Sequence, residues 1–126
     1  MANPANLLYT KEHEWVRIEG NTATVGITDY AQHSLGDIVY IELPKTGNSI
    51  EQFKSVGVVE SVKAVSDLFT PVGGDVVEVN TILEDDPAAV NRDPYGTGWL
   101  FKVVLKDGAK PAGLLSSSDY DAIATD

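Results

Sequence analysis

The stretch 56–71 places a single amine, that of Lys63, between two apolar and β-branched runs. The runs 56–59 and 65–70 have the composition of strands, and neither shows the spacing of an amphipathic helix. They predict a hairpin with residues 62–64 at its tip. An amine held in solvent on two anchored strands suits recognition and acylation by another enzyme. Because a lone lysine is more often an ordinary surface residue, this chemistry needs support from the rest of the chain.

The sequence argues against several other kinds of chemistry. Use of Lys63 as the nucleophile of a small hydrolase or lyase would need a desolvated amine with a lowered pKa, and a hairpin tip in water has the opposite effect. The chain has no cysteine, which excludes disulfides and thiolate metal sites. With only two histidines we predict no metal site, and we expect His13 to be a surface or strand residue rather than an acid–base catalyst.

Composition and charge limit the possible partners. The 126 residues are 43% hydrophobic and 22% charged, which predicts one domain over 1–126 with a real core. With 9 basic and 19 acidic side chains the net charge is −10, so nucleic acid is not an expected partner. No apolar run is long enough to span a membrane. Residues 1–6 lack the features of a secretory or transit peptide, so we expect a cytoplasmic protein, or a mitochondrial-matrix one if this chain is processed.

Hydrophobic alternation and turn residues divide the chain into short elements. The predicted strands are 7–10, 15–18, 22–27, 38–43, 56–59, 65–70, 75–80 and 99–105. The predicted short helices are 28–35, 87–91 and a terminal helix with Tyr120 and Ile123, capped by a serine of 116–118. Thr28 or Asp29 is expected to cap the first helix and Gly36 to end it. The core is expected at about 7–105, followed by a C-terminal extension, 106–126.

An internal repeat suggests how these strands are arranged. Two pairs of segments match at an offset of 38 residues, namely 27–29 with 65–67 and 36–39 with 74–77. Two matches in one ungapped frame favour duplication over chance. The sequence therefore predicts a mostly β fold, a flattened barrel or β-sandwich of two quasi-repeated halves with short helices. In this frame Lys63 corresponds to Val25, so only one half carries an amine there. We expect the aromatic residues Trp15, Tyr40 and Trp99 in or near the core.

Several short motifs match one protein family over most of the chain. They are His13-Glu14-Trp15, residues 25–29 and 36–39, Glu60-Ser61-Val62-Lys63-Ala64, Ser66-Asp67, Val79-Asn80, Val90-Asn91, Pro94-Tyr95 and Gly98-Trp99. Through these motifs the chain resembles the H proteins of the glycine cleavage system, which are relatives of lipoyl and biotinyl domains. The resemblance implies a hybrid fold like that of lipoyl domains. Beyond Lys102 the match is poor except for a helix-like Asp119-Tyr120.

The resemblance implies lipoic acid in amide linkage to Lys63, within an attachment motif of Glu60, Ser61, Val62 and Ala64. It implies a glycine decarboxylase (P protein) that loads an aminomethyl group onto the lipoyl arm. An aminomethyltransferase (T protein) would pass the carbon to tetrahydrofolate and release ammonia, and dihydrolipoamide dehydrogenase (L protein) would reoxidise the dithiol. A lipoyl-attaching enzyme is the fourth implied partner. We expect a monomeric, non-catalytic carrier.

Two carboxylates are candidates for holding the ammonium of the loaded arm, Glu14 and Asp67, because charge-assisted hydrogen bonds strengthen where water is excluded. Each could instead be an ordinary surface charge. Glu60 is a candidate for recognition by the lipoyl-attaching enzyme. Some family members carry a histidine where Ser34 stands, whereas here the histidine is His33, so we expect no histidine role beside the arm.

Related functions stay open at this point. They are a lipoyl-relay or binding protein of the same fold, and a lipoyl domain of a 2-oxoacid dehydrogenase complex. Biotin acceptors usually place methionine on both sides of the lysine, whereas Val62 and Ala64 stand here. Oxoacid dehydrogenase domains commonly have Asp-Lys-Ala and are shorter. The His-Glu-Trp segment and the region around Tyr95 and Trp99 favour the H protein.

Overall fold

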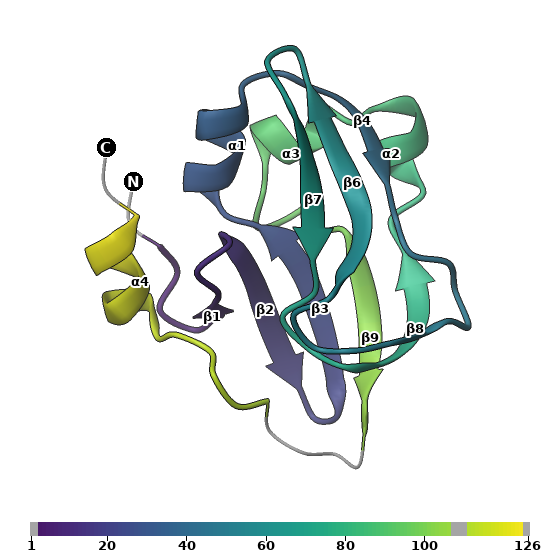
Figure 1. Ribbon diagram of the computed structural model, residues 1–126, viewed down its shortest axis with the longest axis vertical. Helices are drawn as coiled ribbons and strands as arrows, with labels where there is room; N and C mark the ends of the chain where they lie inside the picture. Colours follow the sequence, from purple (N-terminus) through teal and green to yellow (C-terminus); the bar gives the residue numbers. More distant parts are fainter. Residues whose placement is uncertain (1–2, 107–110, 125–126) are drawn as a thin grey trace.

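The protein, seen here as a computed structural model, is described over residues 3–106 and 111–124. Its strands form two sheets (Figure 1), six-stranded in the order β1-β2-β3-β9-β8-β5 and three-stranded in the order β4-β6-β7. The strands are β1 (Leu8–Tyr9), β2 (Glu14–Glu19), β3 (Thr22–Ile27), β4 (Ile38–Glu42), β5 (Ser49–Ile50), β6 (Ser55–Ser61), β7 (Val65–Phe69), β8 (Gly74–Val79) and β9 (Phe101–Leu105). The helices are α1 (Asp29–Leu35), α2 (Ile82–Asp85), α3 (Ala89–Arg92) and α4 (Ser117–Ile123).

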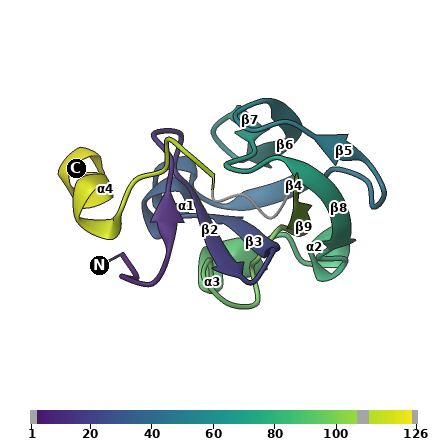
Figure 2. The same ribbon diagram turned by 90° about the horizontal axis from the view of Figure 1, so that it is seen from below.

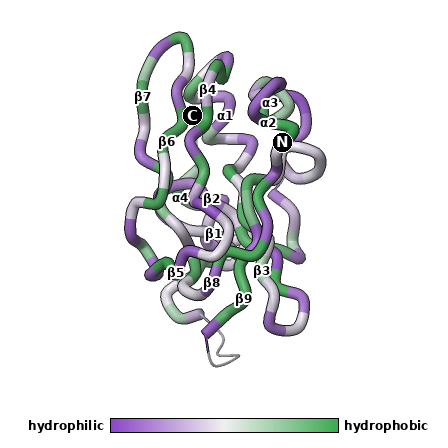
Figure 3. Tube along the Cα trace, turned by 90° about the vertical axis from the view of Figure 1, so that its right-hand side faces the viewer, coloured by the Kyte–Doolittle hydropathy of each residue, from purple (hydrophilic) through white to green (hydrophobic). Residues whose placement is uncertain are grey.

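The main core lies between the two sheets. Inward-facing residues of the larger sheet, such as Val25 and Val103, belong to one buried cluster with Ile41, Val59 and Leu68 of the smaller sheet. Seen from below, β2 and β3 of the larger sheet lie apart from β6 and β7 of the smaller one (Figure 2), and hydrophobic colour follows the central strands (Figure 3). Burial of these apolar side chains is the main driving force for packing the sheets together. The predicted mostly β, two-sheet architecture is confirmed.

Most predicted elements agree with the observed ones. β3 and the end of α1 have the predicted bounds, and Thr28 caps α1 by accepting a hydrogen bond from the amide of Ala31. The terminal helix is also present, capped by Ser116. Strand β5 and helix α2 are present in the structure but are not among the predicted elements.

The repeat describes shared strand starts rather than whole halves. The offset of 38 aligns β4 with β8, and a Gly-Asp pair leads into each strand region. It also aligns α1 with β7 and the loop after it, and strand β3 with the hairpin tip. The correspondence is therefore limited to the entry into two strands that lie in different sheets.

A smaller aromatic cluster lies on the far side of the larger sheet from the hairpin. It contains Tyr9, Trp15 and Tyr120, all fully buried, and joins α4 to β1 and β2. Tyr9 also exchanges two backbone hydrogen bonds with Leu115, at 2.8 and 2.7 Å. In the predicted C-terminal extension, residues 107–110, 125 and 126 lie outside the described residues. No helix in the described part of the chain is long and apolar enough to cross a membrane.

Candidate functional site

The hairpin tip is braced by its own hydrogen bonds. The hydroxyl oxygen of Ser61 accepts hydrogen bonds from the backbone amides of Lys63, at 3.2 Å, and Ala64, at 3.1 Å. The backbone amide of Ser61 donates to the carbonyl of Ala64 at 2.8 Å. The amide of Val62 donates to the carbonyl of Asp37 at 3.0 Å, which ties the tip to the segment before β4. The predicted hairpin with residues 62–64 at its tip is thus observed, and its backbone has a defined shape.

The side chain of Lys63 is exposed and lies against the end of α1. Its Nζ is 3.5 Å from the carbonyl oxygen of Ser34. Gly36, which ends α1 with a φ of 79°, leaves room for the stem, since a Cβ there would lie 3.2 Å from Cε of Lys63. Glycine is therefore favoured at position 36 both by its left-handed backbone and by the lysine that passes over it.

Asn91 fixes the strand entry beside the lysine, a role that sequence reasoning missed. Its side chain donates to the Gly36 carbonyl at 2.8 Å and to Gln32 at 2.9 Å, and accepts the amide of Ile38 at 2.9 Å. All of its polar contacts are local to the end of α1 and the start of β4. The Val-Asn pair at 90–91 was a family motif, but the sequence carries no signal that places α3 beside α1.

A small cleft of about 180 Å³ lies between α1, the start of β2 and the hairpin. Its apolar lining consists of Ile27, Ala31, Leu35, Val59 and Leu68, and its polar lining of Glu12, His13, Glu14, Ser34, Ser66 and Asp67. We call this the arm cleft. Both predicted carboxylates therefore lie at one cleft, together with Ser34, whose carbonyl is next to Lys63 Nζ. His33 is exposed and does not line it.

Glu14 is the buried acid of this cleft, with 3% of its surface exposed. Its Oε1 accepts a hydrogen bond from the hydroxyl of Thr10 at 2.6 Å, and the backbone of Phe69 provides another. Burial nevertheless dominates and raises the pKa of Glu14 to about 8. The carboxyl is thus mainly protonated at neutral pH, and a cation placed beside it would lower the pKa and favour the carboxylate.

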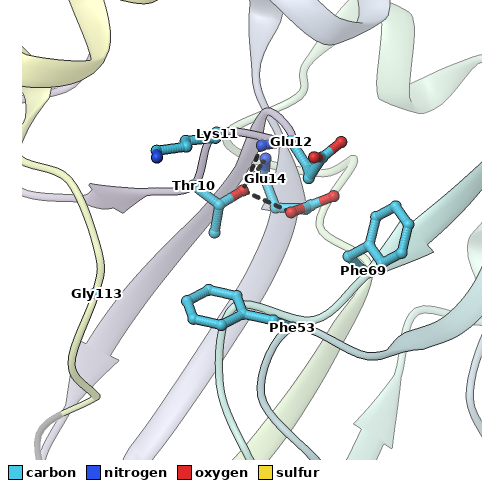
Figure 4. A pocket seen from close by; sticks show the side chains of 7 residues that line it. All are labelled: Thr10, Lys11, Glu12, Glu14, Phe53, Phe69 and Gly113. Carbon is cyan, nitrogen blue, oxygen red and sulfur yellow. Dashed lines mark hydrogen bonds between the residues drawn. The ribbon is translucent and has the colours of Figure 1, made fainter.

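Glu14 also faces a second pocket, of about 340 Å³ (Figure 4). In that view its carboxyl lies between the side chain of Thr10 and the ring of Phe69, and the ring of Phe53 also lines the pocket. These apolar rings help to explain the lack of solvation that raises its pKa.

Asp67 differs from Glu14 in its surroundings. It lies on β7, at the rim of the arm cleft, and is exposed. It is paired with Val58 of β6, whose neighbour Val59 faces the core, so the alternation of the strand directs the Asp67 side chain toward the outer face of the sheet. Glu14 therefore lies in the buried wall of the cleft, whereas Asp67 contributes to its rim while its side chain is directed to the outer face of the sheet.

His13 is neither a free surface residue nor a strand residue. It occupies a turn before β2 with a φ of 69°, is half-buried, and its Nδ1 lies 2.7 Å from the hydroxyl of Tyr120. The same hydroxyl lies 2.7 Å from Oγ1 of Thr28, the cap of α1. Burial lowers the pKa of His13 and raises that of Tyr120 to about 12. Helix α4 thus supports the wall of the arm cleft through one side chain.

We expect Tyr120→Phe to lower the free energy of unfolding by about 1–3 kcal/mol, because it leaves buried polar partners on His13 and Thr28 with one hydrogen bond fewer. Urea titration measures this loss. Tyr40→Phe is the matched control, since it also removes a phenolic hydroxyl but from a side chain that is 50% exposed. Equal stability of the two variants would contradict the supporting role of Tyr120.

Comparison with known proteins agrees with this architecture. The family model described as "Glycine cleavage H-protein" matches residues 7–126. A glycine cleavage system H protein of Symbiobacterium thermophilum is 55% identical over 123 residues, which cover 97% of this chain and 96% of that relative. Another, of Rubrobacter xylanophilus, is 56% identical over 117 residues, covering 93% of this chain and 90% of that relative.

The fold is also similar to a solved structure. The crystal structure of a glycine cleavage system H protein from Mycobacterium marinum superposes with a TM-score of 0.89 at 41% identity, covering 95% of this chain and 97% of that one. Lipoyl carriage in the glycine cleavage system is the known role of this family. The family model matches residues 7–126, and both the relatives and the solved structure are similar to this chain over nearly its full length. The chain therefore belongs to the glycine cleavage H-protein family.

Proposed function

We propose that this chain carries a lipoyl group in amide linkage to Lys63 and shuttles the aminomethyl group of glycine between the enzymes of the glycine cleavage system. The observation that supports this most directly is the exposed amine on a hydrogen-bonded hairpin tip. The motif residues act in different ways. Ser61 braces the tip, Val62 anchors it to Asp37, and Ala64 closes the turn.

Attachment requires an activated lipoyl group, such as a lipoyl adenylate, as co-reactant. The lone pair of Lys63 Nζ attacks the carbonyl carbon, the bond from that carbon to the phosphate oxygen breaks, and AMP departs while the nitrogen loses a proton to solvent. An exposed amine whose described side-chain contact is one carbonyl at 3.5 Å is free to enter another enzyme's active site. The hairpin tip exposes the Lys63 amine, so no part of the hairpin has to unfold for it to react.

The arm cleft fits the loaded group chemically. When bound, the lipoyl dithiol supplies the sulfur that carries the aminomethyl unit. The apolar lining residues Ile27, Leu35 and Val59 suit the hydrocarbon part, and the Glu14 carboxyl suits the ammonium end. By accepting that cation, Glu14 would keep the amine protonated and so slow its loss.

In this scheme the chain is a non-catalytic, monomeric carrier in the cytoplasm. Its partners would be the glycine decarboxylase, the aminomethyltransferase, dihydrolipoamide dehydrogenase and the lipoyl-attaching enzyme. The family match supports membership of that system. The three enzymes of the cycle would act on the arm, because the reactive group extends from the tip.

The proposed function is tested by intact-mass measurement of chain purified from its native host, followed by peptide mapping. We expect one lipoyl adduct, on the peptide containing Lys63. Unmodified chain with glycine-cleaving turnover of its own would reject the carrier assignment, and an adduct on another lysine would reject the site.

We expect Glu14→Gln to shorten the lifetime of the loaded carrier by roughly tenfold or more, since a charge-assisted hydrogen bond contributes about 1.5–3 kcal/mol. The carrier is loaded enzymatically, the decarboxylase is removed, and formaldehyde release is followed. Asp67→Asn should have a smaller effect, because Asp67 is exposed at the rim. Equal release from Glu14→Gln and native carrier would exclude Glu14 as the protecting group.

A further inference from the structure

The outer face of the three-stranded sheet has an ordered pattern of side chains. Residues directly opposite one another in antiparallel strands share a face. The register therefore produces two rows across β4, β6 and β7, which are Tyr40–Glu60–Val65 and Glu42–Val58–Asp67. Apolar and acidic side chains alternate along each row and between the rows. We call these six residues the chequered face.

Tyr40 belongs to this face because of a β-bulge. The register between β4 and β6 shifts between Ile38 and Tyr40, so that Val39 and Tyr40 are both exposed. The sequence-based expectation of a core position for Tyr40 is therefore wrong, since half of its surface is exposed. Tyr40 and Val65 lie on either side of Glu60 in the first row and are 50% and 67% exposed, so the row presents two large apolar side chains to solvent.

The charge of the face is also uncompensated. Three of its six side chains are acidic and none is basic. Among residues 3–106 and 111–124, no ion pair involves Glu42, Glu60 or Asp67. The complementary surface is therefore an apolar hollow with arginine or lysine side chains around it.

We propose that the chequered face is the docking surface for the enzyme that attaches the lipoyl group, a partner with such a basic-rimmed hollow. This inference rests on the proposed function of Lys63. Glu60 and Val65 lie three and two residues from the lysine, on the two strands that carry the tip. Before modification, the amine extends from the backbone of the tip only by the length of the Lys63 side chain. An enzyme that brings it to an acyl adenylate must therefore contact the protein close to the tip.

The other enzymes of the system have a weaker need for this face. They act at the far end of a long arm, so they can approach the carrier from several directions. The face is adjacent to the lysine itself, and the hydrogen bond from Val62 to Asp37 holds β4 at a constant position relative to the tip. The attaching enzyme is thus the partner for which a fixed arrangement of face and amine matters most.

The test is lipoylation of unmodified carrier by the purified attaching enzyme with lipoate and ATP. The variant Tyr40→Ser/Val65→Ser should raise KM for the carrier tenfold or more with little change in kcat, because buried aromatic anchors dominate interfaces. Glu42→Gln/Glu60→Gln should raise KM at low salt and reduce its dependence on salt. Binding of carrier to the enzyme without ATP, measured by calorimetry, should weaken in parallel.

Val77→Ser/Ile82→Ser is the matched control, since both residues are exposed apolar side chains outside the chequered face. We expect its KM and binding to equal those of the native chain. If the Tyr40/Val65 variant also keeps native KM and binding, the docking surface is wrong although Lys63 is still modified. If neither the native chain nor any variant receives lipoate at Lys63, the proposed function itself is wrong.

Discussion

Lys63→Arg is expected to abolish lipoylation completely while the protein folds normally. Arginine keeps the positive charge and the stem that lies over Gly36, but a guanidinium does not form the stable amide. Because the side chain is exposed and its contact with the Ser34 carbonyl is long, at 3.5 Å, the free energy of unfolding should change by less than about 0.5 kcal/mol. Intact mass after incubation with the attaching enzyme, lipoate and ATP measures the outcome.

Lys54→Arg is the control for this variant. Lys54 is also an exposed lysine, and it lies just before β6 rather than at the hairpin tip. It should be lipoylated to the native extent. Full modification of Lys63→Arg, at Lys54 or elsewhere, would show that the tip is not the attachment site.

Glu14→Gln is expected to make the protein more stable than the native chain at alkaline pH, by about 4 kcal/mol near pH 9, with similar stability near pH 5. Burial in the folded protein raises the pKa of Glu14 to about 8, whereas in an unfolded chain it lies near its ordinary value of 4.5. The folded state therefore holds a proton that the unfolded state releases between these two values. Stability associated with Glu14 is complete below about pH 4.5 and is lost as pH rises through 8.

The measurement is urea unfolding of both proteins at several pH values. Glutamine has the shape of the protonated acid and can still accept the Thr10 hydrogen bond, but it has no proton to lose. Glu12→Gln is the control, because Glu12 is exposed, although it lines the same cleft. A difference between Glu14→Gln and native protein that does not vary with pH would show that Glu14 ionises normally in the fold.

Local patterns were enough to predict the hairpin and its lysine. The β-branched runs around Lys63 and the cap at Thr28 act over a few residues, so they are readable in sequence. The presence of Glu14 and Asp67 at one cleft came from the family resemblance, and the structure places both there. Nothing local shows that Glu14 is buried, since the same His-Glu-Trp letters would fit an exposed strand end.

The parts that could not be predicted depend on contacts between distant segments. The hydroxyl of Tyr120 contacts His13 and Thr28, which lie about a hundred positions earlier in the sequence. No hydrophobic period in the sequence predicts these contacts. Tyr40 reads as a core residue because it sits in an apolar run, yet the one-residue bulge at Val39 turns it outward. Bulges follow from the register between strands, which a single strand does not specify.

The bracing of the hairpin tip by Ser61 has a consequence for how tightly the arm is held. Because the backbone of the tip is fixed, a lipoyl group attached to Lys63, as proposed, would move only through rotations of the lysine side chain and of its own hydrocarbon chain. On so short a tether, the group would have an effective concentration at the arm cleft on the order of millimolar or above. A contact too weak to capture the same group from solution would still keep it docked for most of the time. If the arm docks there as proposed, a partner enzyme would compete with an intramolecular site, and its binding energy would have to displace the arm before chemistry begins.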